Sequence, residues 1–302
     1  MICKDRVVIV TGAGRGLGRA HALEFARQGA KVVVNDLGVA RDGTGEAASG
    51  PAQDVVAEIG KLGGRAVASP HDVATEDGAK ALVALAVETF GGLDVLVNNA
   101  GFLRDRMLVN LSEDEWDAVV RVHLKGHFLP LKHAGLYWRA QSKAGRAVDA
   151  RVVNTSSGAG LLGSVGQGNY SAAKAGIVGL TLVASAELGR YGVTVNAIAP
   201  AARTRMTEEV FAQTMARPAE GEFDAMAPEN VSPLVVWLGS AGSRGVTGRV
   251  FEAEGGRICV MDAFRHGPSV DRGARWDPAE VGDAVTELLA RAPAPEPVYG
   301  AS

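Results

Sequence analysis

Seven short apolar runs, rich in β-branched residues, recur along the chain and predict strands. The first, Val7 to Val10, is apolar at every position and ends at Thr11-Gly12. A run without polar alternation is typical of a strand that is buried on both faces, as in a parallel sheet. The predicted strands are Val7 to Val10, Lys31 to Asn35, Arg65 to Ser69, Leu93 to Val97, Arg151 to Thr155, Gly192 to Ile198 and Gly248 to Glu252.

Segments with helical periodicity separate these strands. Pro51 suits the first position of one helix, and Ser112 with Glu115 makes a capping box for another. The predicted helices are one that ends at Gln28, then Ala52 to Leu62, Glu76 to Phe90, Ser112 to Trp138, the helix that contains Tyr170, Glu229 to Leu238, and Pro278 to Ala290. Strands that alternate with helices through short turns predict an α/β fold with a doubly wound parallel sheet flanked by helices.

We expect one domain in this chain of 302 residues. Residues 1–260 form it, and residues 261–302 are a C-terminal extension that packs on the same domain and ends in a loose tail. Residues 37–50 and 141–150 are expected loops. Residues 204–228 carry methionines and phenylalanines among charges. They suit either ordinary core helices or a mobile lid over a substrate.

A glycine-rich turn lies between the first predicted strand and the helix after it. It comprises Gly12, Ala13, Gly14, Arg15, Gly16, Leu17 and Gly18. Glycines let the backbone approach a pyrophosphate closely, and the start of the following helix offers N–H groups and a positive dipole end. In this strand–turn–helix context, the pattern predicts a Rossmann-type dinucleotide site rather than a simple tight turn.

The nature of the dinucleotide depends on Asp36, which ends the second predicted strand. A carboxylate there accepts hydrogen bonds from a ribose diol and repels a 2′-phosphate, which favours NAD over NADP. Arg15 favours NADP instead, because a cation within the glycine turn could bind a phosphate. We weigh Asp36 more heavily and predict NAD.

Tyr170 and Lys174 stand four residues apart in a predicted helix, so their side chains share one face. An ammonium beside a phenol favours the phenolate and lowers the pKa of the tyrosine from its usual value near 10. Ser157 follows a predicted strand and could hold a substrate oxygen together with the phenol. This group could move a proton to or from an alcohol or a carbonyl. Taken alone, the Tyr170–Lys174 spacing favours an exposed i,i+4 contact, because such pairs occur by chance in many helices.

Composition narrows the classes of partner. The net charge of −3 does not favour binding to nucleic acid or to an anionic membrane. No apolar run reaches the length of a membrane span. Two cysteines, Cys3 and Cys259, make no disulfide framework. The N-terminus has no signal-peptide pattern, and the C-terminus carries no peroxisomal or retention tripeptide. We expect a cytoplasmic protein with a small-molecule substrate.

Three motifs together resemble the signatures of the short-chain dehydrogenase/reductase family. They are Thr11-Gly12-x-x-x-Gly16-x-Gly18, then Asn98-Asn99-Ala100-Gly101, then Ser157 with Tyr170-x-x-x-Lys174. They occur in the family's order and at about its spacings, and the resemblance covers at least residues 5–256. It implies an oxidoreductase that interconverts a secondary alcohol and a ketone.

The resemblance also implies roles for further residues. Asp72 and Val73 would lie at the adenine, while Asn98, Ala100 and Gly101 would line the nicotinamide-side ribose. Lys174 would bind that ribose as well as act on Tyr170. Pro200 and Thr204 would lie at the nicotinamide end, although Ala201 stands where the family usually has glycine after the proline. The helix after Tyr170, rich in small residues, would pair across an interface in a homodimer or homotetramer or simply pack on the sheet.

A closer resemblance indicates the substrate. The chain resembles one branch of the family in three segments, Asn35 to Gly38, Gly101 to Met107 and Arg121 to Gly126. This branch is the (3R)-hydroxyacyl-CoA dehydrogenase unit of the D-specific multifunctional β-oxidation enzyme. The same unit is also classed as a type of 17β-hydroxysteroid dehydrogenase. The resemblance implies oxidation of a 3-hydroxyacyl-CoA. The alternatives are a hydroxysteroid dehydrogenase that acts on a free ring hydroxyl, and a catalytically silent nucleotide-binding protein.

His123 departs from the family's usual asparagine, which helps to tie a relay water to the active-site lysine. The branch named above also has histidine there, so we carry His123 over as a site residue. His123 and His127 form an i,i+4 pair that could bind a metal ion, but the sequence has no third ligand at a spacing typical of metal sites. We therefore expect no metal, and we expect packing or hydrogen bonding for His127.

Overall fold

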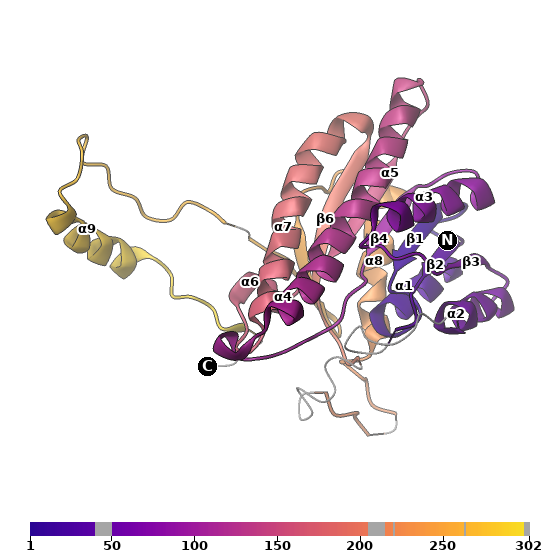
Figure 1. The fold of residues 1–302 in the computed structure, drawn as a ribbon, viewed down its shortest axis with the longest axis horizontal. Helices are drawn as coiled ribbons and strands as arrows, with labels where there is room; N and C mark the ends of the chain where they lie inside the picture. Colours follow the sequence, from indigo (N-terminus) through magenta and orange to yellow (C-terminus); the bar gives the residue numbers. More distant parts are fainter. Residues whose placement is uncertain (40–49, 205–214, 220, 263, 299–302) are drawn as a thin grey trace.

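The computed structural model describes residues 1–39, 50–204, 215–219, 221–262 and 264–298. Within them, eight strands form one sheet in the order β3-β2-β1-β4-β5-β6-β7-β8, and β1 to β7 run parallel (Figure 1). The strands are β1 (Val7–Thr11), β2 (Lys31–Asn35), β3 (Arg65–Ser69), β4 (Val95–Asn98), β5 (Ala150–Thr155), β6 (Val193–Ala201), β7 (Val250–Glu254) and β8 (Arg257–Met261). The predicted doubly wound parallel sheet is confirmed.

The eighth strand was not predicted. We expected Gly248 to Glu252 to be the last strand, but the chain turns back after Glu254 and β8 pairs antiparallel with β7. Gly255 allows the turn because its φ of 53° is one that other residues rarely adopt. A glycine pair between two extended segments is a hairpin signal, and the sequence does contain it at Gly255-Gly256.

Helices cover both faces of the sheet. They are α1 (Gly16–Arg27), α2 (Gly50–Lys61), α3 (Glu76–Phe90), α4 (Glu113–Val120), α5 (Gly126–Lys143), α6 (Gly158–Leu162), α7 (Gly168–Leu188), α8 (Ser232–Leu238) and α9 (Pro278–Arg291). One buried cluster joins the sheet to α1, α2 and α8, and a second joins it to α3, α5 and α7. This is the sandwich of a doubly wound fold, with both faces of the parallel strands covered (Figure 1).

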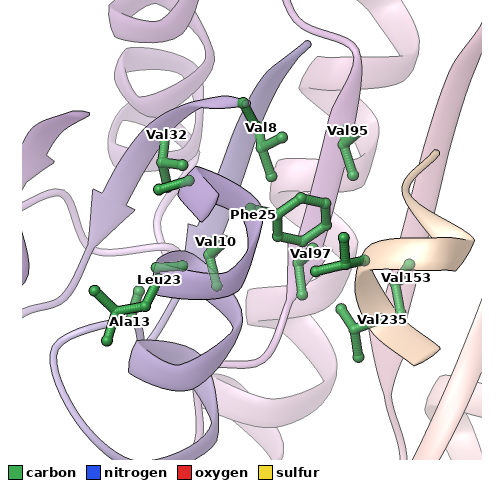
Figure 2. Packing of buried hydrophobic residues seen from close by; sticks show 14 of the residues in the cluster. Val8, Val10, Ala13, Leu23, Phe25, Val32, Val95, Val97, Val153 and Val235 are labelled. Carbon is green, nitrogen blue, oxygen red and sulfur yellow. The ribbon is translucent and has the colours of Figure 1, made fainter. Parts of the chain in front are cut away.

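The first cluster shows how the apolar strand runs are used. Figure 2 shows Phe25 of α1 lying against the valines of β1 and β4, with Val235 of α8 beside it. Phe25 and Val235 are fully buried. Burial of a side chain of this kind stabilises the fold by about 1.5–3 kcal/mol. The absence of polar residues from these runs therefore follows from burial on two faces.

The segment predicted as one helix from Ser112 to Trp138 is interrupted. Ser112 and Glu115 do form the capping box of α4. The chain then makes a π-helical turn over Arg121–Lys125 before α5 begins at Gly126. Helix α5 continues to Lys143, so the expected loop over residues 141–150 is shorter than predicted.

Helix α9 of the C-terminal extension is not buried against the domain, and the expected packing of residues 261–302 stays a prediction. All 14 residues of α9 are described, and none of them is buried. Figure 1 shows an extended segment that carries α9 away from the sheet and its helices. The described residues between β8 and α9, 262 and 264–277, are mostly exposed, and none of their apolar side chains is buried. The expected lid over residues 204–228 falls partly on residues 205–214 and 220, which lie outside the described residues.

One described segment, Gly168–Tyr191, is long and apolar enough to pass a test for a membrane span by length and composition. It consists of α7 and the short turn after it, and α7 packs against α6 and the neighbouring strand β6. A core helix of an α/β domain passes the same test, so this finding is weak evidence for a membrane span.

Candidate active site

A cavity of about 330 Å³ opens at the carboxyl ends of the strands, where the sheet order reverses between β1 and β4. In open α/β sheets, ligands bind in the crevice at this switch point. Most residues predicted from the sequence to bind a cofactor line the cavity: Gly12, Arg15, Gly16, Leu17, Gly18, Asp36, Asp72, Val73, Ala100, Gly101 and Thr204.

The glycine turn fits closely against its surroundings. A Cβ added to Gly18 would lie 2.2 Å from the carbonyl oxygen of Gly12, and one on Gly12 would lie 2.8 Å from the Cα of Ala100. Asn99 donates from its side chain to the carbonyl oxygens of Thr11 and Gly12, at 3.0 and 3.3 Å. The missing side chains at Gly12 and Gly18 therefore let the turn fold on itself and lie against the loop after β4, and both glycines line the cavity, where a pyrophosphate would approach the backbone.

Asp36 closes one end of the cavity. One oxygen of its carboxylate accepts a hydrogen bond from the backbone N–H of Gly14 at 2.8 Å, and the other accepts from Gly38 at 2.6 Å. The carboxylate is thus held at the rim of the cavity with its negative charge in place. Arg15, at the start of α1, also lines the cavity and is exposed.

Asp72 lies at the same end and forms an ion pair that the sequence did not reveal. Its Oδ2 accepts from Arg121 Nη2 at 2.5 Å, while its Oδ1 accepts from the backbone N–H of Ala74 at 2.8 Å. Both Asp72 and Arg121 line the cavity. An aspartate expected at an adenine is therefore already oriented by a cation from a distant part of the chain.

The residues predicted to bind the cofactor that do not line this cavity are Asn98, Pro200, Tyr170 and Lys174. Asn98 is fully buried and donates to the side-chain oxygen of Asn154 at 3.0 Å and to the carbonyl of His127 at 3.2 Å, so its side chain supports the fold below the cavity. Pro200 lies within β6 and does not line the cavity. The cavity is also lined by residues that were not predicted from the sequence: Asn35, Leu37, Val39, His71, Asn99, Phe102, Arg104, Ala118, Arg121 and Val122.

Tyr170 and Lys174 meet on the first turns of α7. Lys174 Nζ lies 5.5 Å from the centre of the Tyr170 ring and donates a hydrogen bond to the carbonyl of Thr155 at 2.6 Å. Lys174 is only 2% exposed, which excludes the alternative of an exposed i,i+4 pair. Burial lowers the pKa of Lys174 to about 7, because the charged form loses its hydration.

Ser157 lies at the carboxyl end of β5, as the sequence predicted. It is buried and forms the N-cap of the short helix α6, where its Oγ accepts from the backbone N–H of Ala159 at 3.2 Å. Helix α6 packs so closely on α7 that a Cβ on Gly160 would lie 2.6 Å from the Cβ of Lys174. The missing side chain at Gly160 thus allows the serine-bearing turn to lie against the lysine-bearing helix.

His123 lies beside Tyr170. Its ring is edge-on to the tyrosine ring, with 5.1 Å between centroids, and its Nε2 is 2.7 Å from the carbonyl oxygen and 3.1 Å from the backbone nitrogen of Phe102. Burial and the nearby Lys174 lower the pKa of His123 to about 3, so the ring is neutral. The same causes hold the pKa of His127 well below its usual value.

The role of His127 remains a prediction. Its side chain is buried, and among the described residues neither ring nitrogen has a hydrogen-bond partner. Burial favours packing, the first of the two expected roles, while the backbone of Asn98 and of His123 lies near the ring, so hydrogen bonding stays an alternative. Within the described residues, no group of three His, Cys, Asp or Glu side chains could hold a metal ion.

A doubly wound sheet with a bare glycine turn at its switch point defines a dinucleotide-binding fold. The buried lysine beside a tyrosine adds a site for proton transfer next to the dinucleotide cavity. The family model described as short chain dehydrogenase matches residues 6–215, and the chain belongs to that family.

Similar proteins cover nearly the whole chain. The hydroxyacyl-CoA dehydrogenase ChsB1 of Mycobacterium tuberculosis is 46% identical over 94% of this chain and 89% of its own length. The peroxisomal multifunctional enzyme type 2 of Mus musculus is 45% identical over 77% of this chain, which matches 29% of that longer protein. A crystal structure of a short chain dehydrogenase from Mycobacterium avium has 64% identity, a TM-score of 0.88 and full coverage of both chains.

The close approach at Gly18 predicts a large effect of one methyl group. Gly18→Ala would place a carbon 2.2 Å from a backbone oxygen, so the turn must move. We expect dinucleotide affinity to fall at least tenfold in calorimetric titration. Gly60→Ala, in α2 with nothing within 4 Å, is the matched control and should leave affinity unchanged. Equal affinities for the two variants would show that the turn does not carry the pyrophosphate.

Proposed function

We propose that the protein is an NAD-dependent dehydrogenase that oxidises a (3R)-3-hydroxyacyl-CoA to the 3-oxoacyl-CoA. The observation that carries this proposal is the 46% identity with a hydroxyacyl-CoA dehydrogenase over nearly the full length of both chains. The resemblance in Asn35 to Gly38, Gly101 to Met107 and Arg121 to Gly126 supports the same branch. The reverse reaction uses the same groups.

The residues of the site suit this reaction. The glycine turn and the cavity fit a dinucleotide, and NAD, when bound, supplies the acceptor for the hydride from carbon 3. Tyr170, as phenolate, takes the hydroxyl proton. Ser157 donates a hydrogen bond to the same oxygen while it becomes a carbonyl. Lys174, whose Nζ lies 5.5 Å from the centre of the Tyr170 ring, favours the phenolate by its charge and would hold the ribose next to the nicotinamide when NAD is bound. Proton transfer by a positioned base contributes about 10²–10⁴-fold.

The entrance to the site supports an apolar acyl substrate. The loop after β4 exposes Met107, Leu108 and Val109, and the segment before α7 exposes Val165. Arg106 pairs with Gln167 as an isolated bridge, which brings these two segments together just before Tyr170. Exposed apolar side chains gathered beside a site mark a surface for an apolar ligand.

The test is NADH formation by the purified protein with NAD and racemic 3-hydroxybutyryl-CoA. We expect turnover to stop near half conversion, since one hydroxyl configuration is used. The second candidate is oxidation of a free ring hydroxyl of a steroid, which the same apolar entrance favours. Turnover of a free hydroxysteroid alone would establish that function instead. Binding of NAD with no turnover of either substrate would indicate a silent nucleotide-binding protein.

We propose NAD rather than NADP because the Asp36 carboxylate is fixed at the cavity rim. The Asp36→Ser variant no longer repels the 2′-phosphate of NADP, so Arg15 can bind that phosphate. We expect the ratio of kcat/KM for NADP to that for NAD to rise at least tenfold. Asp54→Ser, on the exposed face of α2, should leave the ratio unchanged. An unaltered ratio in Asp36→Ser would place cofactor choice elsewhere.

We propose that the protein works as a homodimer or homotetramer. A groove between α5 and α7 is lined by partly exposed Phe128, Leu136 and Val183. Helix α9 also exposes Val281, Val285 and Leu289. A 14-residue helix is marginal in water without a partner, so these surfaces favour association. Light scattering should give two or four times the chain mass; a monomer at micromolar concentration would contradict the proposal.

We further propose a cytoplasmic location. Cys3 and Cys259 are both free thiols. Reduced thiols are usual where glutathione and thioredoxin operate. Recovery of the protein in the membrane or secreted fraction of its cells would contradict this location.

A further inference from the structure

The π-helical turn Arg121–Lys125 lies beside the cavity, which Arg121 and Val122 help to line. A π-turn holds one more residue than an α-turn, is rare, and is found mostly at functional sites. Here the backbone N–H of Gly126 reaches back to the carbonyl of Arg121, across five residues. The turn carries Arg121 toward Asp72 and His123 toward Tyr170.

At one end the turn is tied to the loop after β3. The Arg121 guanidinium pairs with Asp72, whose second oxygen is held by the N–H of Ala74. Gly126 adds a second contact, because a Cβ there would lie 3.2 Å from Cγ2 of Val73. The position of the turn relative to this loop is thus set by one ion pair and one close backbone approach.

At the other end, His123 is confined on several sides. A Cβ on Gly101 would lie 2.1 Å from His123 Cε1, so the ring fills the space that the glycine leaves. The Phe102 backbone holds Nε2, and the Tyr170 ring meets the imidazole edge-on. His123 is only 1% exposed. The ring of the proposed base is therefore packed against a residue of the π-helical turn.

We propose that Arg121 is a positioning residue, which pairs with Asp72 and thereby holds the π-helical turn in the register that keeps His123 against the ring of Tyr170. If the extra residue of the turn were absorbed into α-helix, the direction of each following side chain would rotate by about 100°. His123 would then leave the tyrosine ring. The inference rests on the proposed role of Tyr170 as the base.

The pair also explains why an exposed contact can matter. Arg121 is 46% exposed and Asp72 27% exposed, so the ion pair itself adds little to global stability. The ion pair would act on the equilibrium between the π-helical and the α-helical arrangement of this turn. A small difference in free energy is sufficient to change the populations of two such arrangements. Catalytic geometry is sensitive to such shifts, since a misplacement of 1 Å can cost about 10²-fold in rate.

The test separates this role from simple contact with the adenine. In Arg121→Gln we expect kcat at saturating NAD to fall about tenfold, with recovery to within threefold of wild type in Arg121→Lys, which keeps the cation. Lys132→Gln is the matched control. Lys132 lies in α5, which continues from the π-helical turn, and it also pairs at 2.5 Å with an acid, Glu76 of α3. A rise in the KM for NAD with kcat unchanged would overturn the proposal.

A second measurement needs no substrate. Hydrogen exchange followed by mass spectrometry on the NAD-free protein should show faster exchange over residues 121–127 in Arg121→Gln and no change there in Lys132→Gln. Unchanged exchange over these residues in Arg121→Gln would overturn the proposal, whatever the substrate. Failure of the wild-type protein to oxidise any 3-hydroxyacyl-CoA would instead overturn the proposed function, and the exchange result would still decide the role of Arg121.

Discussion

Replacement of Tyr170 by phenylalanine is expected to lower kcat by at least 10²-fold, because phenylalanine has no atom that can take the hydroxyl proton. The ring would keep its contacts with His123 and with Lys174, so the fold around it should persist. The cavity that fits the dinucleotide is lined by the glycine turn and the loop after β4, and Tyr170 does not line it. Calorimetric titration should therefore give a Kd for NAD within threefold of wild type.

The matched control for this variant is Tyr191→Phe. Tyr191 lies in the turn after α7 and is only partly buried. Loss of its hydroxyl group should leave turnover unchanged. Steady-state NADH formation with a 3-hydroxyacyl-CoA measures both variants. If Tyr170→Phe kept more than a tenth of wild-type turnover, another group would have to accept the proton and the proposed mechanism would be wrong.

Lys174→Met is expected to abolish turnover and also to stabilise the protein. The lysine is fully buried, and its pKa falls to about 7 in the folded chain from 10.5 in the unfolded chain. A base with a lowered pKa binds fewer protons when folded, so folding is penalised at every pH below 10.5. Methionine removes this penalty but leaves the carbonyl of Thr155 without its donor. We expect a net gain of about 2 kcal/mol in the free energy of unfolding at pH 6.

The gain should depend on pH in a defined direction. Between pH 10.5 and about 7 the unfolded wild-type chain holds a proton that folded Lys174 has lost, so the penalty grows as the pH falls and becomes constant below about 7. Urea denaturation should thus show a larger advantage of Lys174→Met at pH 6 than at pH 9. Lys143→Met, at the exposed end of α5, should show no such advantage. A variant less stable than wild type at pH 6 would mean that Lys174 is not buried as a strained cation.

The strands were predictable because they are buried on two faces. Burial of β1 and β4 between two helical layers requires unbroken apolar runs, and such runs are visible in a sequence. The strand β8 lies at the sheet edge with Ile258 and Val260 exposed, so the burial that marks the other strands is missing. The course of residues 261–302 was not predictable for a related reason, since the amphipathic pattern of α9 shows an apolar face but not what it contacts.

The site was predictable in part. Motif spacing predicted that the glycine turn, Asp36, Ser157, Tyr170 and Lys174 lie near the carboxyl ends of the strands, where the structure has them, while their roles stay predictions. The ion pair of Asp72 with Arg121 could not be found, because its partners are 49 residues apart and no sequence pattern pairs one with the other. Burial of Lys174 is also a property of the packed α6 and α7, not of the sequence around it. The π-helical turn has no signal that separates it from an ordinary helix.

The central claim is that this site moves a hydride and a proton between NAD and a 3-hydroxyacyl-CoA of one configuration. The most direct measurement compares NADH formation by the wild-type protein from pure (3R)- and pure (3S)-3-hydroxybutyryl-CoA, with a free hydroxysteroid run beside them. We expect NADH from the (3R) ester, with kcat/KM at least 10²-fold above that for the (3S) ester. NADH from the free steroid alone, or from the (3S) ester alone, would contradict it.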